Sequence, residues 1–250
     1  AAYSLRSLTG GDPKVVRVRR DTGGGAGDND EQDFTASGIS SGALVDFVGS
    51  GNDGFVTIWY DQSGNGNNAV QPTASEQPKI VDSATGALVP GGLRFDDAQK
   101  LETAGTFSFA SGTTLSTFIT NKSDGDENAY LFRFVSDYIV YNTGGGVRRV
   151  FAGTNANAGS LGSDEELWTT ISTLNSSGGT SNFFADGTLV SSADVNIGTK
   201  AVSSKVLNIG GATSSNHWNG TVNEVIFYAT DQTSNRAALD ANIISHYGIS

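Results

Sequence analysis

Short strand-like segments recur at regular intervals through the second half of the chain, and loops rich in Gly, Asn and Ser separate them. Successive side chains of a strand point to opposite faces, so alternating or apolar segments of this length indicate strands of packed sheets. Between two of them, Asp186-Gly187 follows Phe183-Phe184-Ala185 and is a strong signal for a two-residue hairpin turn. Many short strands at this spacing predict an all-β sandwich or jelly roll. The expected strands are residues 115–120, 129–135, 138–141, 147–152, 168–174, 182–185, 206–209 and 221–228.

The composition fits one large β domain that carries two helices. The chain has 250 residues, of which 33 are Gly, and Gly destabilises helix interiors while it suits turns. Sandwiches of this length often form one unit, so we expect a single domain over residues 1–250. An apolar stripe predicts a short early helix over 41–48 with Ser41 as its cap. A second stripe predicts a C-terminal helix over 235–247 that stops at Gly248.

An apolar strand over residues 55–60 runs into a turn that is dense in side-chain oxygens and amides. Both faces of this strand are largely apolar, which predicts a central strand that is covered on each side. Asp61, Asn65 and Asn67 stand in the turn among glycines, and Asx side chains bond nearby backbone amides in such turns. Two interpretations stay open, because the three side chains either lock the turn or line a ligand pocket.

The run Tyr60-Asp61-Gln62-Ser63-Gly64-Asn65-Gly66-Asn67 resembles the signature of the catalytic domain of the fungal-type α-L-arabinofuranosidase B family. Near the C-terminus, Leu207-Asn208-Ile209-Gly210-Gly211, a polar loop and the apolar strand after Gly220-Thr221 are similar to that family's last segment. This closing pattern also resembles the broader group of laminin-G-like and concanavalin A-like sandwiches. The resemblance therefore implies a concanavalin A-like (laminin-G-like) jelly-roll β-sandwich.

The catalytic carboxylates of that family are absent from their expected places. A retaining glycosidase needs two carboxyl groups that flank the scissile bond. The family's acid/base is an Asp directly after the Gly-Gly pair, and this chain has Ala212 at that position. The family's nucleophile is a Glu in a segment with a vicinal Cys pair, and this chain has no Cys. The resemblance therefore favours a non-catalytic module, and the alternative is a glycoside hydrolase with relocated carboxylates.

A polar loop near the C-terminus has the composition of a sugar-binding site, since an aromatic residue stands there among amides and hydroxyls. An aromatic ring can stack on the CH groups of a sugar while amide groups bind its hydroxyls. The alternative for Trp218 is a ring that folds back onto the sandwich edge. The predicted glycan-binding residues are Asn216, His217 and Trp218 of this loop, with Asp61, Asn65 and Asn67 of the earlier turn.

Two acidic loops are candidate calcium sites, because calcium takes several oxygen ligands and often draws them from one short loop. The spacing of the acids does not match the EF-hand pattern, and the alternative is a pair of solvated loops. The nearby basic strand over 14–20 is expected to pair its arginines with nearby acids, and the alternative is a strip that binds an anionic ligand. The candidate calcium ligands are Asp28, Asp30 and Asp33 in the first loop and Asp124 and Asp126 in the second.

Charge and residue usage narrow the class of protein. A net charge of −11 and a pI near 4.4 disfavour binding to a nucleic-acid backbone, which needs a positive surface. No apolar run is long enough for a transmembrane helix, so we expect no membrane insertion. The absence of Met suits an exposed, oxidising setting. We therefore expect an extracellular or virion-surface recognition or structural module, of the phage-fibre or bacterial-adhesin type. Its expected partners are glycans or other subunits of a surface assembly, and these include further copies of itself.

Overall fold

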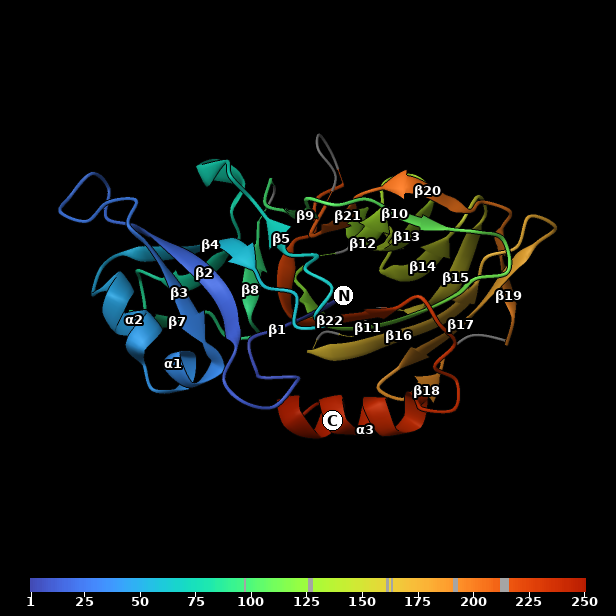
Figure 1. The fold of residues 1–250 in the computed structure, drawn as a ribbon. Helices are drawn as coiled ribbons and strands as arrows, with labels where there is room; N and C mark the ends of the chain where they lie inside the picture. Colours follow the sequence, from blue (N-terminus) through green and yellow to red (C-terminus); the bar gives the residue numbers. More distant parts are fainter. Residues whose placement is uncertain (97, 126–127, 161, 163, 191–192, 212–215) are drawn as a thin grey trace.

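The computed structural model describes residues 1–96, 98–125, 128–160, 162, 164–190, 193–211 and 216–250. Strands dominate, and the described helices are short near the N-terminus and longer at the C-terminus (Figure 1). In chain order the elements are β1 (Ala2–Ser4), β2 (Lys14–Asp21), β3 (Glu31–Thr35), α1 (Ala36–Ser40), α2 (Ala43–Val48), β4 (Asp53–Trp59), β5 (Ala69–Val70), η1 (Ala74–Glu76), β6 (Lys79–Asp82), β7 (Ala87–Leu88), β8 (Leu93–Phe95), β9 (Leu101–Thr103), β10 (Phe107–Phe109), β11 (Thr114–Ser123), β12 (Ala129–Phe134), β13 (Tyr138–Asn142), β14 (Val147–Phe151), β15 (Asn155–Ser160), β16 (Glu166–Thr173), β17 (Gly179–Ala185), β18 (Thr188–Leu189), β19 (Val195–Gly198), β20 (Val202–Lys205), β21 (Leu207–Ile209), β22 (Gly220–Tyr228) and α3 (Arg236–Tyr247).

Two antiparallel layers face each other and form the sandwich (Figure 1). The first layer runs in the order β1, β22, β11, β16, β17 and β19. The second layer runs in the order β9, β21, β12, β13, β14 and β15. Because side chains alternate along each strand, each layer has an inner face toward the other layer and an outer face. The all-β sandwich predicted from the strand spacing is confirmed, as is the helix at its C-terminal end.

The first part of the chain extends the sandwich on one side, at the left of Figure 1. There β2 lies between β3 and β4, and the other edge of β4 pairs with β5 and β6. β8 joins β22 in the first layer, and β5 joins β9 in the second. Since β4 has neighbours on both edges, the central position expected for residues 55–60 is confirmed. Phe55 and Ile58 are only half-buried, so the strand is less completely covered than expected. Among the described residues, no helix is both long and apolar enough to cross a bilayer.

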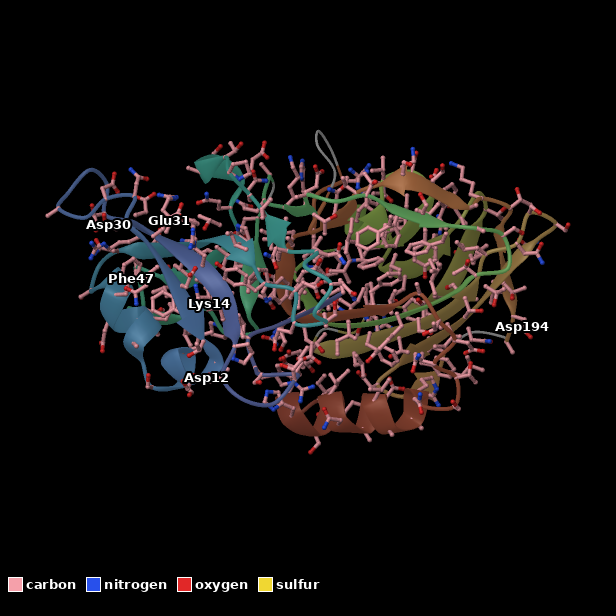
Figure 2. The ribbon with its side chains drawn as sticks, viewed as in Figure 1. Asp12, Lys14, Asp30, Glu31, Phe47 and Asp194 are labelled. Carbon is pink, nitrogen blue, oxygen red and sulfur yellow. The ribbon has the colours of Figure 1, made fainter. Side chains whose placement is uncertain are left out.

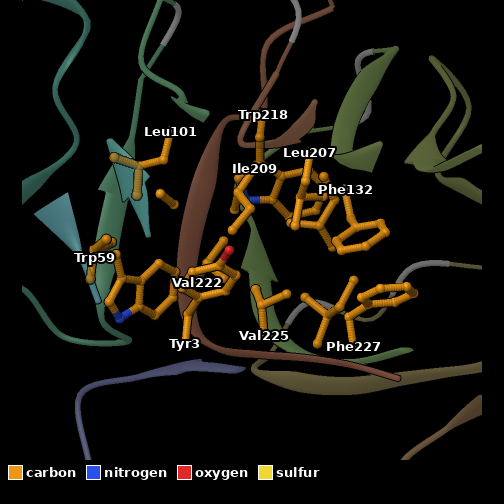
Figure 3. Packing of buried hydrophobic residues seen from close by; sticks show 14 of the residues in the cluster. Tyr3, Trp59, Leu101, Phe132, Leu207, Ile209, Trp218, Val222, Val225 and Phe227 are labelled. Carbon is orange, nitrogen blue, oxygen red and sulfur yellow. The ribbon is translucent and has the colours of Figure 1, made fainter. Parts of the chain in front are cut away.

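Aromatic side chains fill the space between the two layers. The rings of Phe132 in β12 and Phe227 in β22 lie 6.0 Å apart between their centroids. Figure 3 shows Phe132 and Leu207 of the second layer facing Val225 and Phe227 of the first. Fully burying a side chain of this size stabilises a protein by about 1.5–3 kcal/mol. Further rings in the same cluster are those of Phe107, Phe109 and Phe134.

Helix α3 covers the outer face of the first layer. Ile243 is buried there against Phe118, Leu167 and Ile226. Gly248 follows the helix with φ 67°, a left-handed conformation that Gly adopts without strain and that ends a helix. The predicted C-terminal helix and its stop are therefore confirmed, and the first helical residue is Arg236.

A buried carboxylate lies beneath the last turn of α3 and has its charge fully compensated. Glu224 accepts hydrogen bonds from Arg6 Nε at 2.8 Å and from Arg6 Nη2 at 2.9 Å. The hydroxyls of Ser4 and Tyr247 donate to the same carboxylate at 2.7 and 3.1 Å. Burial raises the pKa of Tyr247, and the neighbouring charge of Glu224 raises it further. This cluster ties the N-terminal segment, β22 and α3 together.

Three local details differ from the sequence-based expectations or refine them. Of the helix expected over 41–48, residues 43–48 form α2, and the unexpected α1 precedes it, separated from α2 by Gly42 with φ 88°. The Ser41 hydroxyl donates to the carbonyl oxygen of Gly38 at the end of α1, so Ser41 does not cap α2. In β4 the register to β2 shifts at a bulge, and Val56 and Trp59 are both buried as a result.

Candidate functional site

The outer face of the second layer gathers polar and aromatic side chains from six strands, and we call it the Tyr130–Arg133 face. Side chains alternate along each strand, and a bulge between Tyr130 and Phe132 in β12 places Tyr130 and Arg133 on the same face, opposite the core side chains. Cross-strand pairing aligns the residues of this face in two neighbouring rows. The first row holds Tyr130, Tyr141, Arg149 and Asn157, from β12 to β15. The second row holds Glu102, Asn208, Arg133, Ile139, Phe151 and Asn155, from β9 to β15.

The first row is held in place by contacts among its own members and with the second row. The rings of Tyr130 and Tyr141 meet edge to face, with centroids 5.7 Å apart and planes at 83°. The Tyr141 hydroxyl donates to Asn155 Oδ1 at 2.8 Å, and Arg149 Nε donates to Asn157 Oδ1 at 2.8 Å. Flat rings bordered by amide and guanidinium groups match the lining of small-ligand sites.

Arg133 is a nearly buried cation of this face that has no ion-pair partner among the described acids. Its side chain is only 9% exposed, and its Nε is buried without a hydrogen-bond partner. Its guanidinium lies over the Tyr130 ring at 5.5 Å, and no described acid forms an ion pair with it. Burial lowers the pKa of Arg133, although the charges of Tyr130 and Glu102 act in the opposite direction. A buried charge without a hydrogen-bonded partner is costly to a fold.

Asn208 lies next to Arg133 in the second row, and only one of its two side-chain polar atoms has a hydrogen-bond partner. Its Nδ2 donates to Glu102 Oε2 at 2.6 Å, whereas its Oδ1 is buried without a partner. A buried polar atom left without a hydrogen bond costs about 1–3 kcal/mol. Arg133 and Asn208 therefore place a buried donor without a partner on the residue next to a buried acceptor without a partner, and buried polar groups of this kind call for an explanation.

Asp61 locks the turn after β4. Its carboxylate accepts hydrogen bonds from the backbone amides of Ala2 at 2.8 Å, Ser63 at 2.9 Å and Asn67 at 3.0 Å. Burial acts to raise the pKa of Asp61, but the hydrogen bonds from Ser63, Ala2 and Asn67 outweigh it and lower the pKa. Of the two interpretations left open by the sequence, these bonds favour the structural one for Asp61.

Asn65 and Asn67 border a cleft of about 830 Å³ between the β4–β5 turn and α3. Phe107 and Phe109 of β10 and Tyr228 of β22 also line this cleft. The backbone carbonyl of Asn67 accepts the hydroxyl proton of Tyr3, so only its side chain is available to a ligand there. The two asparagines thus lie apart from the loop that contains Trp218, in contrast to the single site that the sequence reasoning assembled from them.

Trp218 belongs to the core and offers no face to a sugar. It is 0% exposed, and its ring meets Trp168 edge to face with centroids 5.8 Å apart. Figure 3 shows it beside Ile209 and Leu207. Its role as a stacking platform is therefore corrected to that of a core side chain, because burial of this large ring outweighed the polarity of its neighbours in the sequence.

The other residues of that loop are divided between the described and undescribed parts of the chain. Asn216 and His217 are half-buried, and the backbone carbonyl of Asn216 accepts the Tyr130 amide proton at 2.9 Å. Asn216 therefore lies at the border of the Tyr130–Arg133 face. Ala212, the position of the family's acid/base, lies outside the described residues.

Most of the acids proposed as calcium ligands are engaged by protein groups. Arg20 binds Asp30 at 2.7 Å, and Arg17 binds Asp33 at 2.7 Å. Asp30 lies at one end of the molecule, as its distance from Asp194 at the opposite end shows (Figure 2). No group of three acidic or histidine side chains suited to a metal ion occurs among the described residues. Of the remaining candidates, Asp28 accepts the Thr22 amide proton, Asp124 pairs with Arg94, and Asp126 lies outside the described residues.

Comparisons with known proteins add information on the fold. No protein-family model matches the chain, and no curated protein matches it either. A mutant GH54 α-L-arabinofuranosidase soaked with 4-nitrophenyl α-L-arabinofuranoside is 14% identical with a TM-score of 0.67, over 98% of this chain and 62% of that chain. An arabinofuranosidase complexed with arabinofuranosyl-α-1,2-xylobiose is 13% identical with a TM-score of 0.64, over 96% and 61%. A Trypanosoma rangeli sialidase is 14% identical with a TM-score of 0.50, over 78% and 32%.

At these identities the likeness shows the fold alone. The protein shares the β-sandwich of the arabinofuranosidase structures, in agreement with the fold implied by the two sequence segments quoted above. The chain spans about three fifths of the length of those arabinofuranosidase chains.

Four strands of the Tyr130–Arg133 face, β12, β13, β14 and β21, were predicted from the sequence, whereas β9, β15 and the site itself were not. One signal was available, because Arg133 stands between Phe132 and Phe134 in an aromatic strand. A charged residue at that position must lie on the face opposite the two core rings. Neighbours such as Glu102 and Asn208 come from distant strands, and no local pattern joins them to Arg133.

Proposed function

We propose that this protein is a non-catalytic recognition module that binds glycans through the Tyr130–Arg133 face. The observation that carries the proposal is the pair of unmet buried groups, Arg133 Nε and Asn208 Oδ1, beside the edge-to-face pair of tyrosines. Sugars present donors and acceptors on one ring together with apolar CH faces, and this combination matches the face.

The distribution of carboxyl groups supports a binding role over hydrolysis at this face. Glycoside hydrolysis requires two carboxyl groups that flank the bond. The two rows contain one carboxyl group, that of Glu102, which Asn208 Nδ2 engages at 2.6 Å. The position that holds the acid/base in the resembling family is Ala212 in this sequence. We therefore place recognition, and not bond cleavage, at the face.

A glycan array with the intact protein tests the proposal, and paired variants locate the site. Tyr130→Ala is expected to weaken binding of any captured glycan by about tenfold or more, since it removes a stacking surface and the ring beneath Arg133. Tyr228→Ala is the matched control, because Tyr228 is a half-buried tyrosine that lines the cleft near Asn65. Loss of binding in Tyr228→Ala alone would move the site to that cleft. A clean negative on a broad array would overturn the glycan proposal.

The setting of the module is proposed from its composition. An acidic chain of net charge −11 without Cys or Met supports an extracellular or virion-surface role in which the module decorates a larger assembly. Light scattering and electron microscopy of material isolated from its source provide the test. A fibre- or particle-bound chain, or a homo-oligomer, is the expected result, and a free monomer would restrict the role to a secreted recognition module.

A hydrolase remains the second candidate, and one observation favours it. Glu165 is half-buried, burial raises the pKa of its carboxyl, and its partner is the amide of Asn223. Asn223 lines a cleft of about 680 Å³ together with Arg6 and Tyr247. A raised pKa is what a general acid requires. Turnover of aryl-arabinofuranosides or polysaccharides that Glu165→Gln abolishes would support this candidate, and no turnover on a broad panel would remove it.

A further inference from the structure

We infer that the glycan taken by the Tyr130–Arg133 face carries a carboxylate and that Arg133 binds this carboxylate, an inference that rests on the proposed function. Two observations lead to it, the distribution of ion pairs over the molecule and the geometry around Arg133. Both concern residues that the structure describes.

Cations without an acidic partner are concentrated on this face. Of the 15 Lys and Arg residues, all but four form an ion pair with a described acid. Arg133 and Arg149 belong to the two rows, and Lys200 Nζ lies over the Phe151 ring of the second row at 5.3 Å. Lys122, the remaining one, is exposed on β11 in the other layer. In a chain of net charge −11, a face with surplus positive charge is suited to an anionic partner.

The geometry around Arg133 fits a planar carboxylate. A guanidinium presents its donors as a fixed fork, and a carboxylate can accept two of them side by side. The Tyr130 ring below the guanidinium restricts its orientation. Nε has no protein acceptor and is itself buried, so a carboxylate must approach it through the 9% of the residue that stays exposed. An anion there would offset the burial that now disfavours the charge of Arg133.

Glu102 and Asn208 complete the recognition. Glu102 is two positions along the row from Arg133, and its carboxylate accepts a hydrogen bond from the intervening Asn208. The Oδ1 of Asn208 is a buried acceptor without a partner next to Arg133, and we assign it to a hydroxyl of the same sugar. A neutral sugar would satisfy Asn208 but would leave the charge of Arg133 uncompensated.

The test compares each acidic sugar with a neutral form of the same backbone by titration calorimetry. Trigalacturonate is paired with its methyl ester, and 3′-sialyllactose is paired with lactose, so the two arms separate uronate from sialate as the source of the carboxylate. We expect the acidic member of one pair to bind at least about tenfold more tightly. We also expect its affinity to fall as salt rises, because surface charge interactions are screened.

Variants assign the effect to Arg133. Arg133→Gln is expected to abolish the preference for the acidic member, and Arg133→Lys to weaken it by about tenfold, because an ammonium has no planar fork. Arg149→Gln, which leaves the buried positions intact, is expected to reduce the preference by a smaller factor. Lys122→Gln is the control, because it removes a cation that also lacks an ion-pair partner but lies away from the face. This variant is expected to leave binding unchanged. Circular dichroism verifies that each variant is folded.

The outcomes separate this inference from the proposed function. Equal binding of acidic and neutral members, with loss of both in Tyr130→Ala, would overturn the carboxylate inference and leave the glycan proposal intact. A preference that persists in Arg133→Gln would also overturn it. Failure of all sugars on the array would remove the proposed function and the inference together.

Discussion

Arginines on β2 and arginines on the Tyr130–Arg133 face occupy similar strand surfaces in very different surroundings. On β2, Arg17 binds Asp33, Arg19 binds Asp21 and Arg20 binds Asp30. On the face of the second layer, Arg133 and Arg149 have aromatic and amide neighbours and no described acid as an ion-pair partner. The acids beside β2 explain its arginines as structural residues. The arginines of the face have no acidic partner among the described residues, and this difference is what supports the binding role proposed for them.

A second contrast lies within a single strand. Arg148 points inward from β14, where it is 3% exposed, pairs with Glu166 and lies over the Trp168 ring at 5.2 Å. Arg149, the next residue, points outward and bonds only to Asn157 among the described side chains. Alternation of faces thus places two adjacent arginines in different surroundings, one in the core and one on the proposed binding face.

The largest expected effect is a difference in the free energy of unfolding between the variants Arg148→Met and Arg133→Met. Removing Arg148 leaves Glu166 as a half-buried charge without its partner, which lowers the free energy of unfolding by about 3–5 kcal/mol. Removing Arg133 eliminates an uncompensated charge, so stability stays within about 1 kcal/mol of the wild type or rises. Urea unfolding of the two variants measures both values. Similar losses in the two variants would contradict the distinction between paired and unpaired arginines.

The next largest expected effect on stability comes from Asp33. Its carboxylate accepts hydrogen bonds from Lys14, Arg17 and Tyr60 beside β2. The hydrogen bond from Arg17, followed by those from Lys14 and Tyr60, lowers the pKa of Asp33. A carboxyl whose pKa is lowered on folding contributes stability above its unfolded pKa of about 4, and this contribution is lost as the pH falls further.

Asp33→Asn is therefore expected to lower the free energy of unfolding by about 1–3 kcal/mol at neutral pH. The difference from the wild type should shrink steadily below about pH 4. Chemical unfolding measured across this pH range is the test. A difference that stays constant with pH would show that Asp33 contributes nothing through its charge.

A smaller effect is the titration of Tyr60, whose hydroxyl donates to Asp33 at 2.7 Å. Burial and the hydrogen bond to Asp33 raise the pKa of Tyr60 to about 12. Because the folded state holds this proton more tightly than the unfolded state, its contribution is present below about pH 10 and is lost as the pH rises toward 12. Ultraviolet titration of the wild type against Tyr60→Phe isolates the phenol. A Tyr60 that titrates near pH 10 would mean that Asp33 does not engage it.

The smallest expected change in stability follows Asn208→Ala. The variant loses one hydrogen bond to Glu102 and also removes the buried Oδ1 that has no partner, so the two effects nearly cancel, to within about 1 kcal/mol. Binding of the preferred sugar should nevertheless weaken several-fold. Thermal unfolding and calorimetry on the same sample compare the two responses. A large loss of stability without a loss of binding would place Asn208 among the structural residues.

Features set by neighbouring residues could be predicted from the sequence. Asp186 and Gly187 take φ 49° and 78°, and Ala185 pairs with Thr188 across them, which is the two-residue hairpin that this dipeptide predicted. The strand that contains Arg133, the last strand and helix α3 were located to within a few residues for the same reason. Ser41 was misassigned because the helix break depends on Gly42, whose left-handed conformation the apolar stripe does not reveal.

Features that depend on distant residues could not be predicted in the same way. Trp218 follows polar residues in the sequence, yet it is buried, with Trp168 of the distant strand β16 packed against it. The candidate site of Asp61, Asn65, Asn67 and Trp218 was therefore separated into a locked turn, a cleft border and a core residue.

The sequence by itself determined the all-β class and the positions of the longer apolar strands, because alternation and turn chemistry act over a few residues. Shorter or more polar strands such as β3, β15 and β19 were not predicted. Only the tertiary structure decided which faces are adjacent, since strand order and register bring Glu102, Arg133 and Asn208 into one row from three separate strands. Whether an arginine is structural or directed at a ligand depends on the neighbours that this register supplies.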